Sequence, residues 1–201
     1  MTKDARRPLA RLELPIDTEA LARYLIGKLL VRELPEGLAS GRIVETEAYV
    51  VGDAAGHAYR GMTERNRSLF LERGHAYVYV AYGSSYMLNV TSELVGIGAG
   101  VLIRALEPLE GIPIMQLNRG GRRLRDLARG PGRLAAALRI DRSLDGLDLC
   151  REGPLWLGPG DHQPIEIGRS VRIGISREAS RLLRFYLRGS HFVSGPRSLS
   201  A

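Results

Sequence analysis

Tyrosines alternate with small apolar residues in the stretch His75-Ala-Tyr-Val-Tyr-Val-Ala-Tyr-Gly-Ser-Ser-Tyr-Met-Leu-Asn89, until a Gly-Ser-Ser triplet ends the pattern. Side chains two residues apart in a strand point the same way, so the valines predict a core face, whereas Tyr77 and Tyr79 predict a surface or a site. We expect a protruding β-hairpin with Tyr82 at its tip and a return strand over residues 86 to 91. An exposed aromatic tip either inserts into a partner or covers the end of the core.

An earlier strand, predicted over residues 40 to 51, carries two carboxylates on one face. Glu45, Glu47 and Tyr49 share that side by the period of a strand, and small residues suited to packing occupy the other side. The alternative is an edge strand whose charged face is solvated.

Arg104 lies in the middle of an apolar strand predicted over residues 101 to 106. An arginine cannot be buried there without an anionic partner, and Glu47 or Glu45 is the obvious candidate. The sequence therefore predicts contact between these two strands through an ion pair.

The remaining elements are short. Asp17 or Thr18 is expected to cap a helix that ends at Gly27, and Thr63 to cap a second helix through Phe70. Further helices are predicted from Pro108 to Leu117 and over residues 131 to 138, and further strands over residues 28 to 34, 155 to 157, 165 to 175 and 182 to 187.

These elements predict an α+β fold. Hairpins outnumber strand-helix-strand units, so we expect a curved, mainly antiparallel sheet with short flanking helices. Residues 14 to 201 are expected to form a single domain, and residues 1 to 13 a flexible arm.

The chain is strongly basic and rich in arginine. Its 201 residues include 29 Lys and Arg against 22 Asp and Glu, for a net charge of +7, and lysine occurs at only two positions. Arginine binds phosphate in bidentate fashion, which indicates a polyanionic partner, although codon bias would give the same composition. Arg133 lies within the densest basic segment, and Arg65 and Arg67 flank a predicted helix start. These three are candidates for phosphate contact, or else a solvated surface.

Other functional classes have no support in the sequence. Cys150 is the only cysteine and no histidines are paired at helical spacing, so we expect no disulfide framework, no metal and no cofactor. No apolar stretch reaches the roughly 18 residues that a membrane span needs, and the first residues lack an apolar signal core. We expect a cytoplasmic, bacterial-type protein associated with the nucleoid, a monomer without membrane contact.

Carboxylates beside tyrosines and arginines suit one chemistry best. Two carboxylates on one strand face lie roughly 7 Å apart, within the range of inverting glycoside hydrolases. Sugar polymers give no reason for the arginines, however. Hydrolysis of an N-glycosidic bond in DNA uses them for phosphates, the tyrosines for an extruded base, and a carboxylate to activate water.

Several blocks of the sequence resemble one family. They are Gly41-Arg-Ile-Val-Glu-Thr-Glu-Ala-Tyr49, Arg65-Asn-Arg67, Tyr77-Val-Tyr-Val-Ala-Tyr-Gly83, Leu102-Ile-Arg-Ala-Leu-Glu-Pro-Leu-Glu-Gly111 and Leu183-Arg-Phe-Tyr-Leu-Arg-Gly-Ser190. In this order the chain resembles the alkyladenine (3-methyladenine) DNA glycosylase family from about Leu21 to Ser194.

The resemblance implies roles for individual residues. Glu47 would activate water as the general base, and Arg104 would position that water and keep Glu47 ionised. Tyr82 would enter the minor groove of the duplex. The flipped base would be held or discriminated in a pocket formed by Tyr49, His57, Tyr79 and Asn89.

The expected function is therefore excision of alkylated purines from double-stranded DNA in base-excision repair, with deaminated purines as further candidate substrates. The alternatives are a module that stacks single-stranded bases on tyrosines without chemistry, and a structural protein with a tyrosine-rich core. Gly100 and the long loop from Glu93 to Gly100 depart from the family pattern and leave the width of the pocket open, and the role of Glu45 also stays open.

Overall fold

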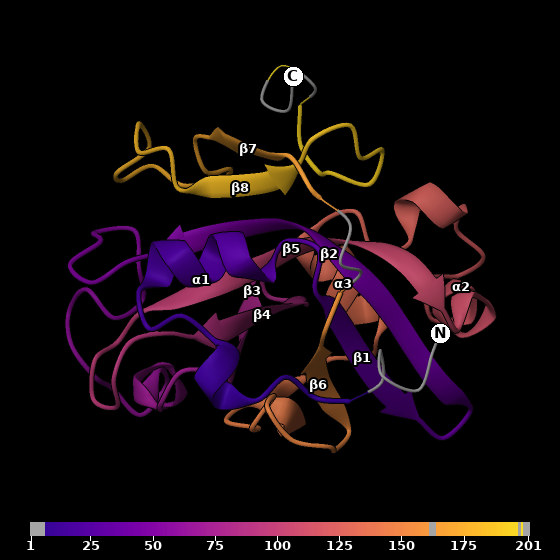
Figure 1. Ribbon diagram of the computed structural model, residues 1–201, viewed down its shortest axis with the longest axis horizontal. Coiled ribbons are helices and arrows are strands. Elements are labelled where there is room, and N and C mark those ends of the chain that lie inside the picture. Colours follow the sequence, from indigo (N-terminus) through magenta and orange to yellow (C-terminus); the bar gives the residue numbers. More distant parts are fainter. Residues whose placement is uncertain (1–6, 161–163, 197, 199–201) are drawn as a thin grey trace.

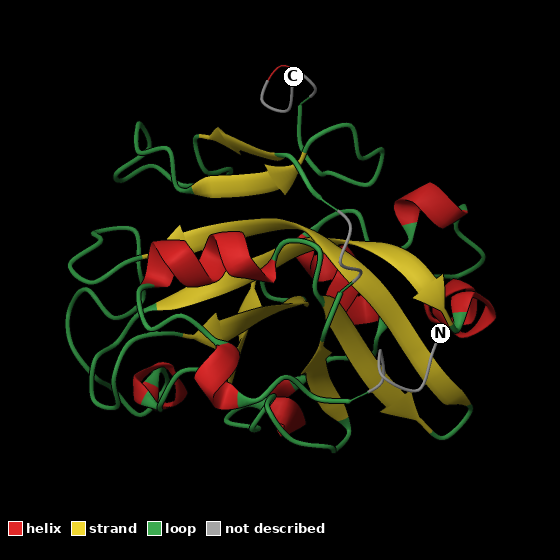
Figure 2. Cartoon of the chain, in the orientation of Figure 1, coloured by secondary structure: helices red, strands yellow, loops and turns green. Residues whose placement is uncertain are grey.

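An eight-stranded antiparallel sheet forms the body of the protein, seen in a computed structural model that describes residues 7–160, 164–196 and 198 (Figure 1). The strands are β1 (Leu29–Leu34), β2 (Gly37–Tyr49), β3 (Ala76–Ala81), β4 (Ser85–Thr91), β5 (Gly100–Glu110), β6 (Leu155–Gly158), β7 (Ile167–Ser170) and β8 (Arg184–Leu187). Three short helices flank them, and the sheet curls into a half-barrel (Figure 2). The predicted α+β class is confirmed.

The strand β2 is the centre of the sheet. It pairs with β5 along one side, while its other side pairs first with β1 and then, from Glu45 to Glu47, with β8. The main path of the sheet runs β3-β4-β5-β2-β1-β6. Because β2 has partners on both sides, the alternative of a solvated edge strand is wrong.

The first helix, α1 (Thr18–Leu25), packs its apolar side against the sheet core. Asp17 caps it, since the carboxylate accepts a hydrogen bond of 2.7 Å from the amide of Ala20. Gly27 follows with φ of +85°, a left-handed conformation that favours glycine, so the chain can turn directly into β1.

The helix predicted to begin at Pro108 is not formed there. Pro108 instead lies in β5 opposite Gly41, beside an irregularity of the β2–β5 pairing. Proline is accepted at such irregularities because no regular ladder bond is lost. The helix α2 (Ile112–Asn118) begins only after Gly111, and α3 (Pro131–Ala137) follows as predicted.

Two other predictions need correction. Residues 63 to 70 contain only a 3-10 turn from Arg67 to Phe70, and the side chain of Asn66 caps the preceding loop by accepting from the amide of Thr63 at 2.6 Å. The expected strand over residues 165 to 175 is regular only in β7, and the segment after Ser170 turns back toward β2.

The N-terminal segment is docked rather than loose from Leu9 onward. Leu9 is buried in the core, and its amide donates to the carbonyl of Leu157 at 2.8 Å. Arg11 binds Asp148 with a nitrogen–oxygen distance of 2.7 Å. The expectation of a flexible arm is thus wrong for residues 9 to 13, and residues 1 to 6 lie outside the described part of the chain.

The tyrosine hairpin forms as predicted from β3 and β4. Val78 is fully buried, but Val80 near the tip is 37% exposed, so the predicted core face covers only the base of the hairpin. The tip packs against α3, where a Cβ atom on Gly132 would lie 3.0 Å from the Cβ of Ser85.

In the described residues, no helix is long and apolar enough to cross a membrane.

Candidate active site

Glu47 lies on β2 with no exposed surface. Its Oε1 accepts a hydrogen bond of 2.7 Å from the amide of Ile173, and its Oε2 accepts one of 3.1 Å from the hydroxyl of Tyr49. Burial raises the pKa of Glu47, and Arg104 and the Ile173 amide counteract this only in part. The carboxylate is therefore fixed in direction and has a higher proton affinity than an exposed glutamate.

Arg104 connects the two carboxylates of β2. Its Nε donates to Oε1 of Glu45 at 3.1 Å, and its Nη1 lies 3.2 Å from Oε2 of Glu47. Burial alone would lower the pKa of this guanidinium, but Glu47 and Glu45 raise it. The predicted ion pair is thus formed with both candidates, and Arg104 stays charged.

Glu45 is fully buried, and two of its partners lie outside the cavity lining. Besides Arg104, its carboxylate accepts hydrogen bonds from Nε of Arg184 at 2.6 Å and from the amide of Ser194 at 2.7 Å. Glu45 and Arg184 both have no exposed side-chain surface. This glutamate joins β2, β5 and β8, so its contacts are those of a structural residue.

Aromatic rings gather beside these charges. His57 contacts Tyr79 edge-on with ring centroids 4.4 Å apart, and Tyr77 and Tyr79 stack with centroids 5.5 Å apart. The Nδ1 of His57 lies 2.8 Å from the hydroxyl of Tyr77, and burial followed by the charge of Arg65 lowers the pKa of His57. His57 is therefore neutral at neutral pH.

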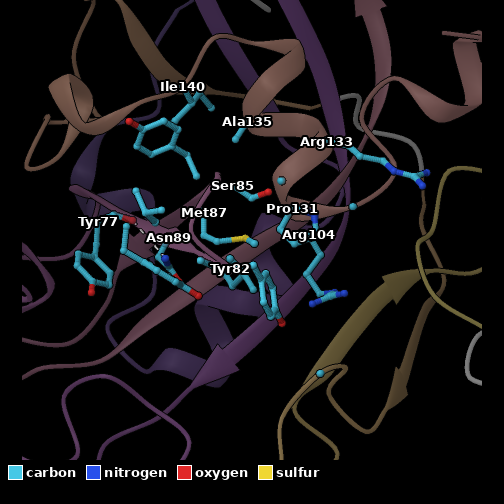
Figure 3. A pocket seen from close by; sticks show the side chains of 18 of the residues that line it. Tyr77, Tyr82, Ser85, Met87, Asn89, Arg104, Pro131, Arg133, Ala135 and Ile140 are labelled. Atoms are coloured by element: carbon cyan, nitrogen blue, oxygen red, sulfur yellow. Dashed lines mark hydrogen bonds between the residues drawn. The ribbon is translucent and has the colours of Figure 1, made fainter. Parts of the chain in front are cut away.

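A cavity of about 1240 Å³ opens between the sheet, the hairpin and α3 (Figure 3). The predicted pocket residues that line it are Tyr49, His57, Tyr79, Asn89 and Arg104. Glu47 itself does not line the cavity. Its carboxylate contacts Tyr49, Arg104 and Ile173, which all do. The cavity thus combines flat apolar walls with a charged corner.

Tyr82 stands at the rim of the cavity. It is 85% exposed and has a φ of +51°, a conformation that side chains other than glycine rarely adopt. Its hydroxyl would lie 3.6 Å from a Cβ atom on Gly174, which also lines the cavity, and Figure 3 shows Tyr82 among the lining residues. Within the cavity, Asn89 donates from Nδ2 to the carbonyl of Tyr77 at 3.2 Å.

The three candidate phosphate ligands differ in position. Arg65 and Arg133 line the cavity, and Arg133 extends away from the tyrosines (Figure 3). Arg67 does not belong to the lining, and its side chain is 70% exposed and pairs with Glu64 at 3.2 Å. The structure therefore groups the first two with the pocket and leaves Arg67 on an open surface.

Sequence reasoning missed a second buried arginine beside the site. Arg172 pairs with Asp53, and both side chains are fully buried. The argument that identified Arg104, an arginine between apolar residues that needs an anion, applies equally to Arg172 between Val171 and Ile173. Tyr77 was predicted to face a surface or a site without a role of its own, and its hydroxyl contacts His57 in the pocket.

Gly100 lies in the cavity wall, but Leu69 fills the space beside it. A Cβ atom at this position would lie 2.9 Å from Cδ1 of Leu69 and 3.0 Å from the carbonyl oxygen of Val90. The small residue thus allows close packing of the wall and does not by itself widen the pocket.

Comparisons with known proteins agree on one family. The model of the methylpurine-DNA glycosylase family matches residues 13–191. The "Putative 3-methyladenine DNA glycosylase" of Mesorhizobium japonicum is 79% identical over 192 residues, which cover 96% of this chain and 92% of the relative. Proteins with the same name from Paraburkholderia phytofirmans and Methanoculleus marisnigri are 55% and 47% identical, over 96% and 89% of this chain and 90% and 94% of the relatives.

These matches place the chain among the DNA glycosylases, enzymes that hydrolyse N-glycosidic bonds. It belongs to the methylpurine-DNA glycosylase family, and the resemblance found in the sequence blocks is confirmed.

Proposed function

We propose that this protein flips alkylated purines, and also deaminated ones, out of double-stranded DNA and hydrolyses their N-glycosidic bond, leaving an abasic site. The observation that carries this proposal is the buried Glu47 carboxylate, held by Tyr49 and Arg104, which both line a tyrosine-rich cavity. Damaged bases pair poorly and cost less to extrude than normal ones, so flipping itself favours the lesion.

The aromatic walls suit a cationic base. N-alkylation gives a purine a positive charge, which draws it to the faces of tyrosines such as Tyr79 and makes it a better leaving group. Burial raises the pKa of Tyr77 to about 12, so this phenol stays neutral at neutral pH. Asn89 is proposed to exclude guanine by opposing its exocyclic amine.

Glu47 is proposed to act as the general base. Its carboxylate takes a proton from the attacking water, the water oxygen bonds to the anomeric carbon of the sugar, and the purine leaves with the electrons of the glycosidic bond. Arg104 lowers the pKa of Glu47 against the effect of burial, and so favours the ionised carboxylate that the reaction needs. No covalent intermediate is required.

The test is release of free base from a duplex that carries one methylated purine or one hypoxanthine, without added metal. Release of methylated purine from the lesion duplex, with none from an undamaged duplex of the same sequence, is the expected result. Absence of release from every lesion duplex would reject the proposed reaction. Release from the methylated duplex alone would restrict the substrates to alkylated purines.

Replacement of Tyr82 tests the proposed wedge. The exposed ring would fill the gap that the extruded base leaves, so Tyr82→Ser should weaken binding to duplex DNA with an abasic site by at least about 5-fold, which corresponds to roughly 1 kcal/mol of lost stacking. Binding is measured by fluorescence anisotropy at fixed salt. Tyr59→Ser is a matched control, because Tyr59 is 53% exposed but lies outside the cavity lining. Equal affinities of Tyr82→Ser and the wild type would contradict the role of the wedge.

A binding module without chemistry is the second candidate. The stacked pair of Tyr77 and Tyr79 would favour it, since such rings serve as platforms for single-stranded bases. Tyr77 is only 2% exposed, however, so a single-stranded ligand has little of its ring to stack on.

A further inference from the structure

Arg172 and Asp53 form a buried ion pair that the proposed reaction does not use directly. Nη1 of Arg172 contacts Oδ2 of Asp53, and Nη2 donates to Oδ1 at 3.1 Å. Neither side chain has exposed surface. Such a pair loses so much hydration that it contributes little net stability, which directs attention to what it holds in place.

The pair fastens the segment after β7 to the end of β2. Nη1 of Arg172 also donates to the carbonyl of Ala48 at 2.9 Å, and the guanidinium carbon lies 4.6 Å from the centre of the Tyr49 ring. The next residue, Ile173, supplies the amide that binds Oε1 of Glu47. Besides Arg104, Glu47 has two hydrogen-bond donors, the Ile173 amide and the Tyr49 hydroxyl, and both belong to residues next to the Arg172 guanidinium.

One nitrogen of the Arg172 guanidinium makes no hydrogen bond in this position. Its Nε is buried and has no partner among the residues that the structure describes. A buried donor without a partner is unfavourable, so the orientation of Arg172 is set by Asp53 and Ala48 together and not by satisfaction of every donor.

We propose that Arg172 and Asp53 are positioning residues, which hold the Ile173 amide and the Tyr49 ring against the two oxygens of Glu47 and thereby aim the carboxylate at the cavity. This inference rests on the proposed role of Glu47 as the base. The guanidinium contacts the Ala48 carbonyl and the Tyr49 ring, and neither residue of the pair lines the cavity.

The pH dependence of the reaction reports this role. The groups that face Glu47 are Arg104 on β5, Glu45 and Tyr49 on β2, Tyr79 on β3, and the Ile173 amide. Burial raises the pKa of Glu47, while Arg104, the amide and the Tyr49 hydroxyl lower it. Loss of the hydrogen bonds from the Ile173 amide and the Tyr49 hydroxyl raises the pKa of Glu47 further. Since the base acts when ionised, the acidic limb of the rate profile moves to higher pH.

The experiment compares single-turnover base release from a duplex with one methylated purine across pH. Asp53→Asn/Arg172→Gln removes both charges while both positions stay polar, and it should lower the rate roughly 10- to 100-fold and shift the acidic limb upward. Arg172→Lys keeps the charge but loses the two-pronged contact, so it should fall between this variant and the wild type. Affinity for undamaged duplex should not change in either.

The matched control is Arg11→Gln/Asp148→Asn, a partly buried ion pair whose residues do not line the cavity. It should leave the acidic limb in place. The inference would be overturned if Asp53→Asn/Arg172→Gln or Arg172→Lys folded and kept both the rate and the acidic limb of the wild type. An equal shift of the acidic limb in the control would also overturn it. Circular dichroism reports folding, and loss of the fold in both pair variants would also overturn it, because the pair would then serve the fold. An inactive wild type would instead reject the proposed function.

Discussion

Glu47→Gln should lower the rate of base release by roughly 100-fold to 10,000-fold, the range that a positioned general base contributes. Glutamine keeps the size of the side chain, and its one amide oxygen can still accept a hydrogen bond from the Ile173 amide, while its NH2 group takes the place of the oxygen that faces Tyr49. It cannot take a proton from water. Single-turnover release of a methylated purine from duplex DNA measures the effect, and equal rates in both proteins would remove Glu47 from the role of base.

The stability of this variant relative to the wild type should depend on pH, because Glu47→Gln takes one carboxylate from Arg104 and also removes the cost of burying the Glu47 charge. Burial is the chief reason that the pKa of Glu47 is higher in the folded state than in the unfolded chain. Ionisation of Glu47 therefore opposes folding fully above the folded-state pKa, and it does not oppose folding below the pKa of the unfolded chain. Glu47→Gln removes this pH-dependent cost, so the stability of the variant relative to the wild type should fall as pH falls between those two pKa values. Urea unfolding at several pH values measures it. A relative stability of the variant that rises on acidification would contradict the sign of the shift.

Glu45→Gln should cost about 3 to 5 kcal/mol of unfolding free energy, the range for removal of one partner from a buried ion pair. Glu45 compensates Arg184, which is fully buried, and shares Arg104 with Glu47. Without its charge, the cluster retains two guanidiniums against one carboxylate. Urea unfolding at neutral pH measures the loss.

The control for this variant is Glu19→Gln, whose carboxylate binds Arg23 and Arg169 at the surface with side-chain exposure of 32%. Surface pairs contribute little, so its change should stay within about 1 kcal/mol. Equal losses in Glu45→Gln and Glu19→Gln would show that burial does not set the importance of Glu45.

Much of the fold follows from local patterns. The tyrosine hairpin and the β1–β2 hairpin were predicted because strand periodicity and turn residues act over a few positions. The helix expected at Pro108 failed because proline is compatible both with a first helical turn and with a β-irregularity, and only pairing with Gly41 decides between them. The prediction of a flexible arm was wrong for residues 9 to 13, because Leu9 binds far along the chain, where its amide donates to the carbonyl of Leu157.

The candidate site divides in the same way. Glu47, Arg104 and the pocket aromatics were named from the sequence, where a strand face and the family blocks bring them together. Arg67 was named too, but its side chain is exposed, pairs with Glu64 and does not line the cavity.

The sequence by itself determined the family, the aromatic hairpin and the pairing of Arg104 with the carboxylates of β2. Strand parity placed Glu45 and Glu47 on the same face and so could not separate them. Only the tertiary structure did, by bringing the Ile173 amide to Glu47 across 126 positions and Ser194 to Glu45 across 149. Contacts at such separations depend on the curl of the whole sheet, and no local pattern records them.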